Sequence, residues 1–282
     1  MKDRRILFVH AHPDDESSKA AATAARYADE GAQVTLVTCT GGEAGEVLNP
    51  TCPPVEASAM GVTRHRELEA ACKVIGFTAR YELGFVDSGL HESLAGVPPD
   101  CFARQPIDVP ANALAEVLRK ERPHVVVTYP ADGGYPHPDH IMVHEVTLRA
   151  LEVAEEPSSE IAGEPWRVPK VYVCHAFPHE RVLMLHEALV ARGEESPFEG
   201  WMERHARREP WPCDARVWVA DWFERRDAAL SRHVTQVDPQ GLWFAWPRDL
   251  ERELFPWECF TRLRSDVPTD AVEDDLFAGL AA

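Results

Sequence analysis

The sequence predicts an α/β fold in which helices cover both faces of a mostly parallel sheet. Short apolar segments rich in β-branched residues alternate with longer segments that have helical periodicity. Strands that alternate with helices in this way are typical of parallel sheets. The chain has 282 residues, of which 45% are hydrophobic, so it is long enough to form a large core.

The first part of the chain supplies the clearest elements. Buried strands are expected at residues 5–10, 33–40 and 124–129. Helices are expected at residues 17–30, 63–75, 111–121 and 140–152, and Gly31 and Gly76 end the first two of them. These strands and helices alternate, and that alternation defines the fold class.

The second part has a looser pattern. Strands are expected at 170–175 and 216–220, and helices at 183–192 and 223–233, after a proline-containing loop at 155–169. The segment 201–257 is rich in tryptophan, which suits either an apolar or sugar-stacking pocket or simply the core. The acidic segment 270–275 is expected to be a solvated end.

Charge and cysteine usage exclude several classes of protein. The net charge is −18, from 29 basic and 47 acidic residues, which argues against nucleic acid or an anionic membrane as a partner. No stretch is long and apolar enough to span a membrane, and the first residues do not resemble a signal peptide. Seven cysteines occur singly, without a CxxC pair, as expected of reduced thiols in a cytoplasmic protein.

Four polar side chains crowd the turn after the first predicted strand: His12, Asp14, Asp15 and Glu16. Burying them without partners would be costly, so a metal or a water-filled site is expected. Asp15 and Glu16 would also fit the first turn of the next helix, where carboxylates favour the positive end of the helix dipole. That alternative accounts for one acid, but not for the histidine and both aspartates together.

A second polar turn, His137-Pro138-Asp139-His140, follows the strand at 124–129. The carboxyl ends of parallel strands share one edge of a sheet, so this turn should meet His12 and the GGEAGE segment at 41–46. Two imidazoles and one carboxylate suit Zn²⁺, leave a coordination position for water, and also accept Fe²⁺. The spacing alone leaves open which aspartate binds the metal.

The strings AHPDDE at 11–16 and HPDH at 137–140, with GGE and GE at 41–46, resemble the LmbE-like (PIG-L) N-deacetylase superfamily. The resemblance implies a Rossmann-like sheet. It implies a metal held by His12, Asp15 and His140. It also implies Asp14 as the general base, His137 as the group that stabilises the oxyanion, Asp139 as the acid that orients His137, and Tyr135 as a mobile residue that can reach the oxyanion.

Within this superfamily the likeness is strongest to the enzymes that cleave mycothiol S-conjugates, and it runs nearly from end to end. It implies that Lys19 occupies the position that separates these enzymes from related deacetylases. Contacts with the sugar–inositol part of the substrate are implied for Glu46, Arg64, Asp87, His233 and Gln236. Two of these residues have a plain structural alternative: Arg64 as a surface arginine paired with Glu67 or Glu69, and His233 as a buried structural histidine.

The expected function is therefore that of a zinc-dependent amidase, acting in detoxification or in a natural-product pathway. The expected products are an N-acetylcysteine S-conjugate and glucosaminyl-inositol. Residues 1–153 would form the metal-binding core, and residues 154–282 would complete the substrate pocket. The two parts are expected to form one compact unit. A homo-oligomer is possible. Two alternatives remain: an N-acetylglucosaminyl-inositol deacetylase, and a non-catalytic module that binds a metal or a sugar.

Overall fold

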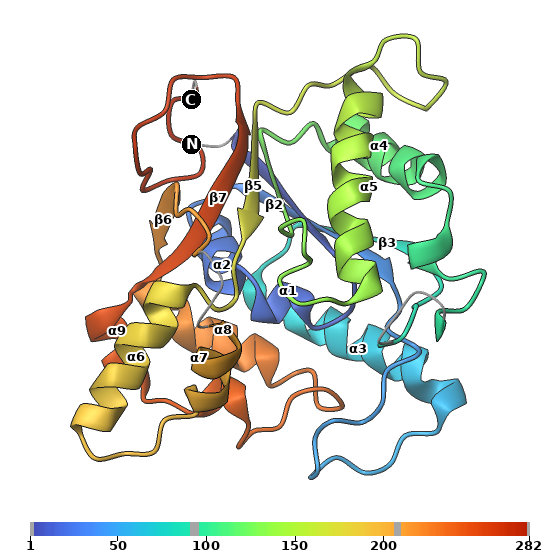
Figure 1. Ribbon diagram of the computed structural model, residues 1–282. Helices are drawn as coiled ribbons and strands as arrows, with labels where there is room; N and C mark the ends of the chain where they lie inside the picture. Colours follow the sequence, from blue (N-terminus) through green and yellow to red (C-terminus); the bar gives the residue numbers. More distant parts are fainter. Residues whose placement is uncertain (1–2, 91–95, 206–209, 281–282) are drawn as a thin grey trace.

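The computed structural model describes residues 3–90, 96–205 and 210–280, and within these ranges it contains one seven-stranded sheet (Figure 1). The strand order is β3-β2-β1-β4-β5-β7-β6. The first five strands are parallel, and β7 runs antiparallel to both of its neighbours. The strands are β1 Arg5–His10, β2 Gln33–Thr40, β3 Ala79–Phe85, β4 Val125–Thr128, β5 Lys170–Cys174, β6 Ala215–Trp218 and β7 Trp257–Ser265. The predicted α/β class is confirmed.

Helices cover both faces of the sheet. One face is covered by α4 and α5, which pack against each other, and the other by α2, α3 and α8 (Figure 1). The α-helices are α1 Asp15–Ser18, α2 Ala21–Asp29, α3 Ala57–Ile75, α4 Asp108–Glu121, α5 Pro138–Glu155, α6 His179–Ala191, α7 Glu199–His205, α8 Phe223–Leu230 and α9 Arg248–Leu254. Short 3₁₀ helices occupy Phe102–Arg104, Ala220–Trp222 and Leu242–Phe244. None of the described helices has the length and apolar character needed to cross a bilayer.

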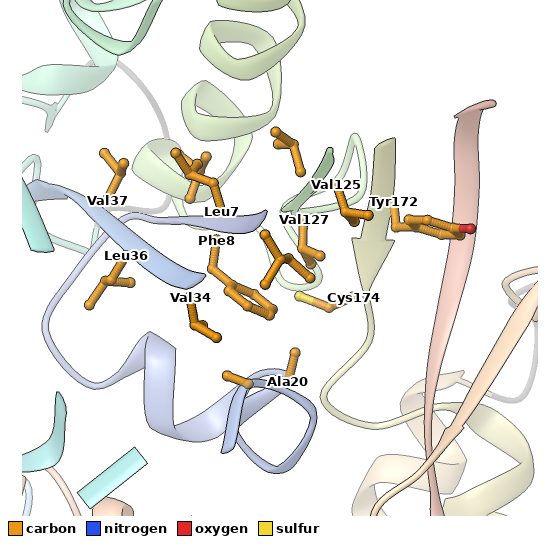
Figure 2. Close-up of a cluster of buried hydrophobic side chains, with 14 of the residues drawn as sticks. Leu7, Phe8, Ala20, Val34, Leu36, Val37, Val125, Val127, Tyr172 and Cys174 are labelled. Atoms are coloured by element: carbon orange, nitrogen blue, oxygen red, sulfur yellow. The ribbon is translucent and has the colours of Figure 1, made fainter. Parts of the chain in front are cut away.

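The core lies on both sides of the central strands. Successive side chains of a strand point to opposite faces, so Leu7 points toward α5 and Phe8 toward α2 (Figure 2). Both are almost completely buried, as are Val125 and Val127 of β4. The strands predicted from continuous apolar runs are therefore the buried centre of the sheet, which holds their carboxyl ends in fixed positions.

The helix expected at residues 17–30 is divided in two. Lys19 is extended and Ala20 adopts a left-handed conformation with φ 60°, so α1 ends before α2 begins. The carboxylate of Glu258 on β7 accepts the backbone N–H of Thr23 at 2.8 Å and thereby caps the start of α2. A partner 235 residues away in the sequence stabilises this break, so helical periodicity could not predict it.

Strands β3 and β7 were not predicted. Strand β3 lies at one edge of the sheet and alternates polar and half-buried residues, without a continuous apolar run. Strand β7 has exposed and charged residues, yet it pairs with both β5 and β6. The sheet thus takes β1–β4 from residues 1–153 and β5–β7 from residues 154–282.

The acidic segment at 270–275 is only partly solvated, which corrects that expectation in part: Asp270 and Asp274 are exposed, but Glu273 is not. Glu273 is buried and accepts hydrogen bonds from Lys170 Nζ and the Tyr172 hydroxyl, both at 2.5 Å. Asp275 accepts from Arg4 and from the hydroxyl of Tyr27. Basic and hydroxyl groups from remote strands and helices therefore bind the carboxyl-terminal segment to the sheet.

Candidate metal centre

The polar turns meet at the carboxyl edge of the sheet, as the parallel topology requires. His12 follows β1, Gly42 follows β2, Asp87 follows β3, and the segment from Tyr129 to His140 follows β4. The two His-Pro-Asp turns, remote in sequence, place the imidazoles of His12 and His140 in direct contact, with ring centres 5.3 Å apart. This edge therefore brings together residues that follow four different strands.

Three of these side chains form a set that fits a divalent ion. His12, Asp15 and His140 are buried, and their candidate ligand atoms all lie within 4.8 Å of one another. Asp15 Oδ2 lies 3.5 Å from His12 Nδ1 and 3.4 Å from His140 Nε2. Ligand atoms of a tetrahedral zinc site with bonds of about 2.0–2.2 Å are roughly 3.2–3.6 Å apart, so these separations suit such a site.

Hydrogen bonds fix which nitrogen each imidazole presents. His12 Nε2 lies 3.1 Å from Asp139 Oδ2, and His140 Nδ1 lies 3.1 Å from the carbonyl oxygen of Gly133. Because an oxygen acceptor takes the N–H of one ring nitrogen, the other nitrogen keeps its lone pair. The free lone pairs are then those of His12 Nδ1 and His140 Nε2, the two nitrogens beside Asp15.

A second group of candidate ligands overlaps with the first: His12, Asp87, His137 and Asp139. It would use the opposite nitrogen of His12, which already faces Asp139 Oδ2 and, at 3.4 Å, Asp87 Oδ1. These carboxylates, together with Asp15, outweigh the burial of His12 and raise its pKa. The three buried carboxylates around one imidazole make this edge of the sheet attractive to a cation.

Asp15 also receives the ammonium group of Lys19. Lys19 Nζ lies 2.5 Å from Asp15 Oδ1, the carboxylate oxygen that does not face the imidazoles. Burial alone would raise the pKa of Asp15, but Lys19 and His140 outweigh it and hold the pKa well below its usual range. Asp15 is therefore a carboxylate, the form that a metal ligand requires.

Asp14 lies beside the candidate ligands in an unusual backbone conformation, with φ 115°. Left-handed conformations of residues other than glycine cost about 1–3 kcal/mol and persist only when the surroundings enforce them. Arg64 supplies part of that enforcement, since its Nη2 donates to Asp14 Oδ2 at 3.0 Å and to the carbonyl oxygen of Pro13 at 2.5 Å. Burial raises the pKa of Asp14, although Arg64 opposes the effect, and a raised pKa makes the carboxylate a better proton acceptor.

Glu16 and His233 hold the same turn from the other side. Glu16 accepts the backbone N–H of Asp14 at 2.9 Å, and its second oxygen lies 2.6 Å from His233 Nε2. Both side chains are almost completely buried. Burial alone would lower the pKa of His233, but Glu16 outweighs it and raises the pKa. His233 thus contacts the Asp14 turn through Glu16.

The glycines of the GGEAGE segment allow Arg64 to approach Asp14. Gly42 has φ 65°, and a Cβ there would lie 2.4 Å from Arg64 Nη1. Gly45 is also close, since a Cβ there would lie 2.7 Å from the same atom. Arg64 Nη1 in turn donates to the carbonyl oxygen of Gly42 at 2.8 Å. Arg64 is buried and holds Pro13, Asp14 and Gly42, whereas Glu67 accepts from Thr235 and Glu69 pairs with Lys73.

Replacing Gly42 by alanine should displace Arg64 and destabilise the fold. Gly31→Ala is a matched control, because Gly31 has φ 85° but no atom within 4 Å of its Cβ position. The control should cost about 1–2 kcal/mol for the left-handed backbone alone. Gly42→Ala should cost roughly 1.5–3 kcal/mol more, because hydrogen bonds of a charged group are lost. Urea unfolding would measure both values, and equal losses would contradict the role of Arg64.

His137 has its protonation state set by the start of α5. Its Nδ1 accepts the backbone N–H of Asp139 at 3.1 Å, so the proton of the neutral ring is on Nε2. Burial lowers the pKa of His137 to about 4, and the neighbouring His12 and His140 add to the effect. His137 is therefore a neutral hydrogen-bond donor at pH 7.

The carboxylate of Asp139 contacts His12 and Ser88. Its Oδ2 faces His12 and accepts from the backbone N–H of Ser88 at 2.9 Å, while Oδ1 accepts from the Ser88 hydroxyl. The backbone N–H of Asp139 donates to His137 Nδ1, because His137 caps the helix at this position. The carboxylate contacts His12, and the role that the resemblance implies for it, orienting His137, stays a prediction.

The remaining expected site residues lie around this centre. The Tyr135 hydroxyl is 3.4 Å from His140 Nε2, and this side chain is 44% exposed, so it borders the opening of the site. Asp87 accepts the backbone N–H groups of Ala44 and Gly89 in addition to facing His12. Gln236 donates to the backbone carbonyl oxygen of Glu46, and Glu46 is exposed. The structure thus places Glu46 and Gln236 next to each other, near Arg64.

Several contributors were not predicted. Ser88 fixes Asp139, Gly133 fixes His140, and Tyr129 stacks on the His140 ring with centres 4.6 Å apart. Glu16 was counted among the polar residues of the turn, with helix capping as the alternative, but its support of Asp14 was not predicted. Polar residues directly after each strand end were the available signal, but they do not reveal which backbone groups the side chains contact.

Comparisons with known proteins place this site in a family context. Residues 7–151 match the family model described as "PIG-L: GlcNAc-PI de-N-acetylase". The chain is 45% identical to a mycothiol S-conjugate amidase of Streptomyces coelicolor, over 98% of this chain and 97% of that protein. It is 41% identical to a 1D-myo-inositol 2-acetamido-2-deoxy-alpha-D-glucopyranoside deacetylase of Thermobispora bispora, over 99% of this chain and 100% of the relative.

A solved structure shares the fold. The N,N'-diacetylchitobiose deacetylase of Pyrococcus horikoshii matches with a TM-score of 0.61 and 19% identity, over 93% of this chain and 84% of that one. At this level of identity the likeness concerns the fold alone.

Proposed function

Because the chain belongs to the GlcNAc-PI de-N-acetylase (PIG-L) family, we propose that it is a metal-dependent hydrolase that cleaves the amide bond of mycothiol S-conjugates. The products would be an N-acetylcysteine S-conjugate and glucosaminyl-inositol. One observation carries the proposal. Asp15 Oδ2 lies 3.5 Å from His12 Nδ1 and 3.4 Å from His140 Nε2, so one carboxylate oxygen faces both imidazoles. It completes a set of three buried candidate ligands that follow strands β1 and β4.

The donor set fits zinc or ferrous iron, held by His12, Asp15 and His140. Such an ion polarises an amide carbonyl and lowers the pKa of water, so that a nucleophile is available near neutral pH. The protein's own part is to orient the imidazoles and to keep Asp15 ionised. Asp139 and Gly133 orient the imidazoles, and Lys19 keeps Asp15 ionised.

Proton transfer is assigned to Asp14. Its carboxylate would remove the proton of the attacking water and later pass it to the departing amine, so that the amine leaves as a neutral group. Arg64 and Glu16 fix the turn that carries Asp14, which keeps the carboxylate in one position. His137 would donate its Nε2–H to the oxygen that becomes negative when water adds to the carbonyl carbon.

The substrate is proposed from the relatives. The 45% identity to a mycothiol S-conjugate amidase favours cleavage next to a cysteinyl group. Deacetylation of N-acetylglucosaminyl-inositol is the nearest alternative, because several relatives carry that name. A module that only binds a metal or a sugar would not need Asp14 or His137, so the geometry around these residues favours an enzyme.

Hydrolysis of two substrates by the metal-loaded protein separates the enzymatic alternatives. We expect kcat/KM for a mycothiol S-conjugate to exceed that for N-acetylglucosaminyl-inositol by at least about tenfold, a difference of roughly 1.4 kcal/mol in transition-state binding. Release of glucosaminyl-inositol, measured by mass spectrometry, reports on both reactions. A preference for the acetylated sugar would identify a deacetylase, and hydrolysis of neither would favour a binding module.

A further inference from the structure

A cavity of about 540 Å³ opens beside the candidate metal centre. Four of its lining residues contact the proposed metal ligands, among them Gly133 and Tyr129, which contact His140. Lys19 Nζ lies 2.5 Å from Asp15 Oδ1, and the Tyr135 hydroxyl lies 3.4 Å from His140 Nε2. A substrate bound at the centre would therefore have direct access to this space.

The cavity is lined by flat aromatic rings: Phe177, Trp201, Trp211 and Trp243, together with His175. Phe177 stacks on Trp243, with centres 4.9 Å apart and planes 26° apart. His175 stacks on Trp211, with centres 5.3 Å apart and planes 23° apart. Part of the tryptophan-rich segment thus lines this cavity, and its ring faces suit a flat apolar group.

The cavity offers little charge to a ligand. Among the lining residues that the structure describes, Lys19 is the one with a permanently charged side chain, and its ammonium already pairs with Asp15. Burial lowers the pKa of His175 to about 4, so that this ring is neutral at pH 7. An uncharged occupant therefore fits the cavity better than an ionic one.

The sheet order gives the metal centre two chemically different flanks. The central strand β1 carries His12, and β2 and β3 lie on one side of it, while β4 and β5 lie on the other. Arg64, Glu46 and Asp87 lie on the β2–β3 side, which is polar. The aromatic cavity lies on the β4–β5 side, after Tyr129 and Cys174. An amide at the centre would therefore extend toward a polar flank in one direction and an aromatic flank in the other.

We propose that the aromatic cavity binds the acyl side of the substrate and selects a large, flat apolar group on the cysteine sulfur. This inference rests on the proposed amidase function and names the class of S-conjugate. A polyhydroxylated sugar–inositol suits the polar flank, which leaves the aromatic flank for the S-substituent. An acetyl group has two carbon atoms and would leave most of the cavity unfilled. Aromatic rings also contact thioether sulfur favourably.

The test compares two conjugates of mycothiol, S-naphthylmethyl and S-methyl, with the metal-loaded protein. We expect the wild type to prefer the naphthylmethyl conjugate in kcat/KM by at least about tenfold, as a filled hydrophobic pocket typically provides. Trp243→Ala should lower that ratio by about tenfold. Trp211→Ala should act in the same direction, and it replaces a side chain that is 45% exposed and so poses less risk to folding. Trp218→Ala is the matched control, because Trp218 is exposed on β6 and does not line the cavity.

A binding measurement separates this inference from the proposed function. Calorimetry should detect N-acetyl-S-(naphthylmethyl)cysteine bound to the wild type and to Trp218→Ala, and at least about tenfold weaker binding to Trp243→Ala. If neither conjugate is hydrolysed, the proposed function fails, while this binding pattern would still support the cavity assignment. A conjugate ratio near one in an active wild type, or equal binding to all variants, would overturn the inference.

Discussion

Replacing Asp14 by asparagine should lower kcat by about 10²–10⁴-fold, the usual contribution of a general acid–base group. Asparagine keeps the size of the side chain and an oxygen that can accept from Arg64, so the turn should retain its conformation. Its amide cannot take a proton from water. Because Asp14 is not among the three proposed ligands, the bound metal should remain, as metal analysis of the purified variant would verify.

A matched control for this variant is Asp249→Asn. Asp249 is exposed in the first turn of α9 and belongs to neither group of candidate ligands, so the same chemical change should leave kcat unaltered. Asp14→Asn with full metal content and wild-type kcat would remove Asp14 from the mechanism. A variant that had lost its metal would instead show that Asp14 is a ligand.

Replacing His140 by alanine should abolish both metal binding and hydrolysis. His140 is completely buried, and it would supply one of only three protein ligands in the proposed set. Replacing a residue that only hydrogen-bonds to a metal ligand typically lowers metal affinity by about 10–100-fold. Removing a ligand itself should therefore lower the affinity by more than about 100-fold. Titration with Zn²⁺ in the presence of a competing chelator measures this affinity independently of activity.

His144→Ala provides the comparison on the same helix. His144 lies one turn further along α5 and its Nδ1 contacts the carbonyl oxygen of Tyr129, outside the proposed set of ligands. Its replacement removes a half-buried imidazole from the same helix without removing a ligand. Affinity for Zn²⁺ should therefore stay within about tenfold of the wild type, the lower range for outer partners. Equal losses in both variants would show that general destabilisation, and not ligation, causes the effect.

The sequence was informative where local pattern and topology act together. Continuous apolar runs identified β1, β2, β4 and β5, because strands buried on both faces need apolar side chains throughout. The parallel order then required the turns that carry His12 and His140 to share one edge. This is why the central set of polar residues could be predicted before any distance was known.

The sequence was less informative where the stabilising partner is remote. The break at Lys19 depends on Asp15 and on Glu258 of β7, and the left-handed Asp14 depends on Glu16 and Arg64. Helical propensity carries no signal of such contacts. The contact between the Asp139 carboxylate and His12 belongs to the same class, because the sequence does not show which remote group a side chain at a helix start faces.

Two strands, β3 at one edge and β7 between β5 and β6, were missed for a related reason. Strand β3 has partly exposed polar residues, and β7 carries charged residues that pair with partners from other segments. Arg262 of β7, for example, donates to Glu273. In such strands the sequence alternates without a long apolar run, and the energy that fixes them comes from pairing with neighbours.

The position of the bound ion tests the central claim most directly. Crystals of the protein grown with Zn²⁺ and measured at the zinc absorption edge would give an anomalous peak at the ion. We predict one peak about 2.0–2.2 Å from His12 Nδ1, Asp15 Oδ2 and His140 Nε2. A peak among Asp87, His137 and Asp139, or no peak at this edge of the sheet, would contradict the account.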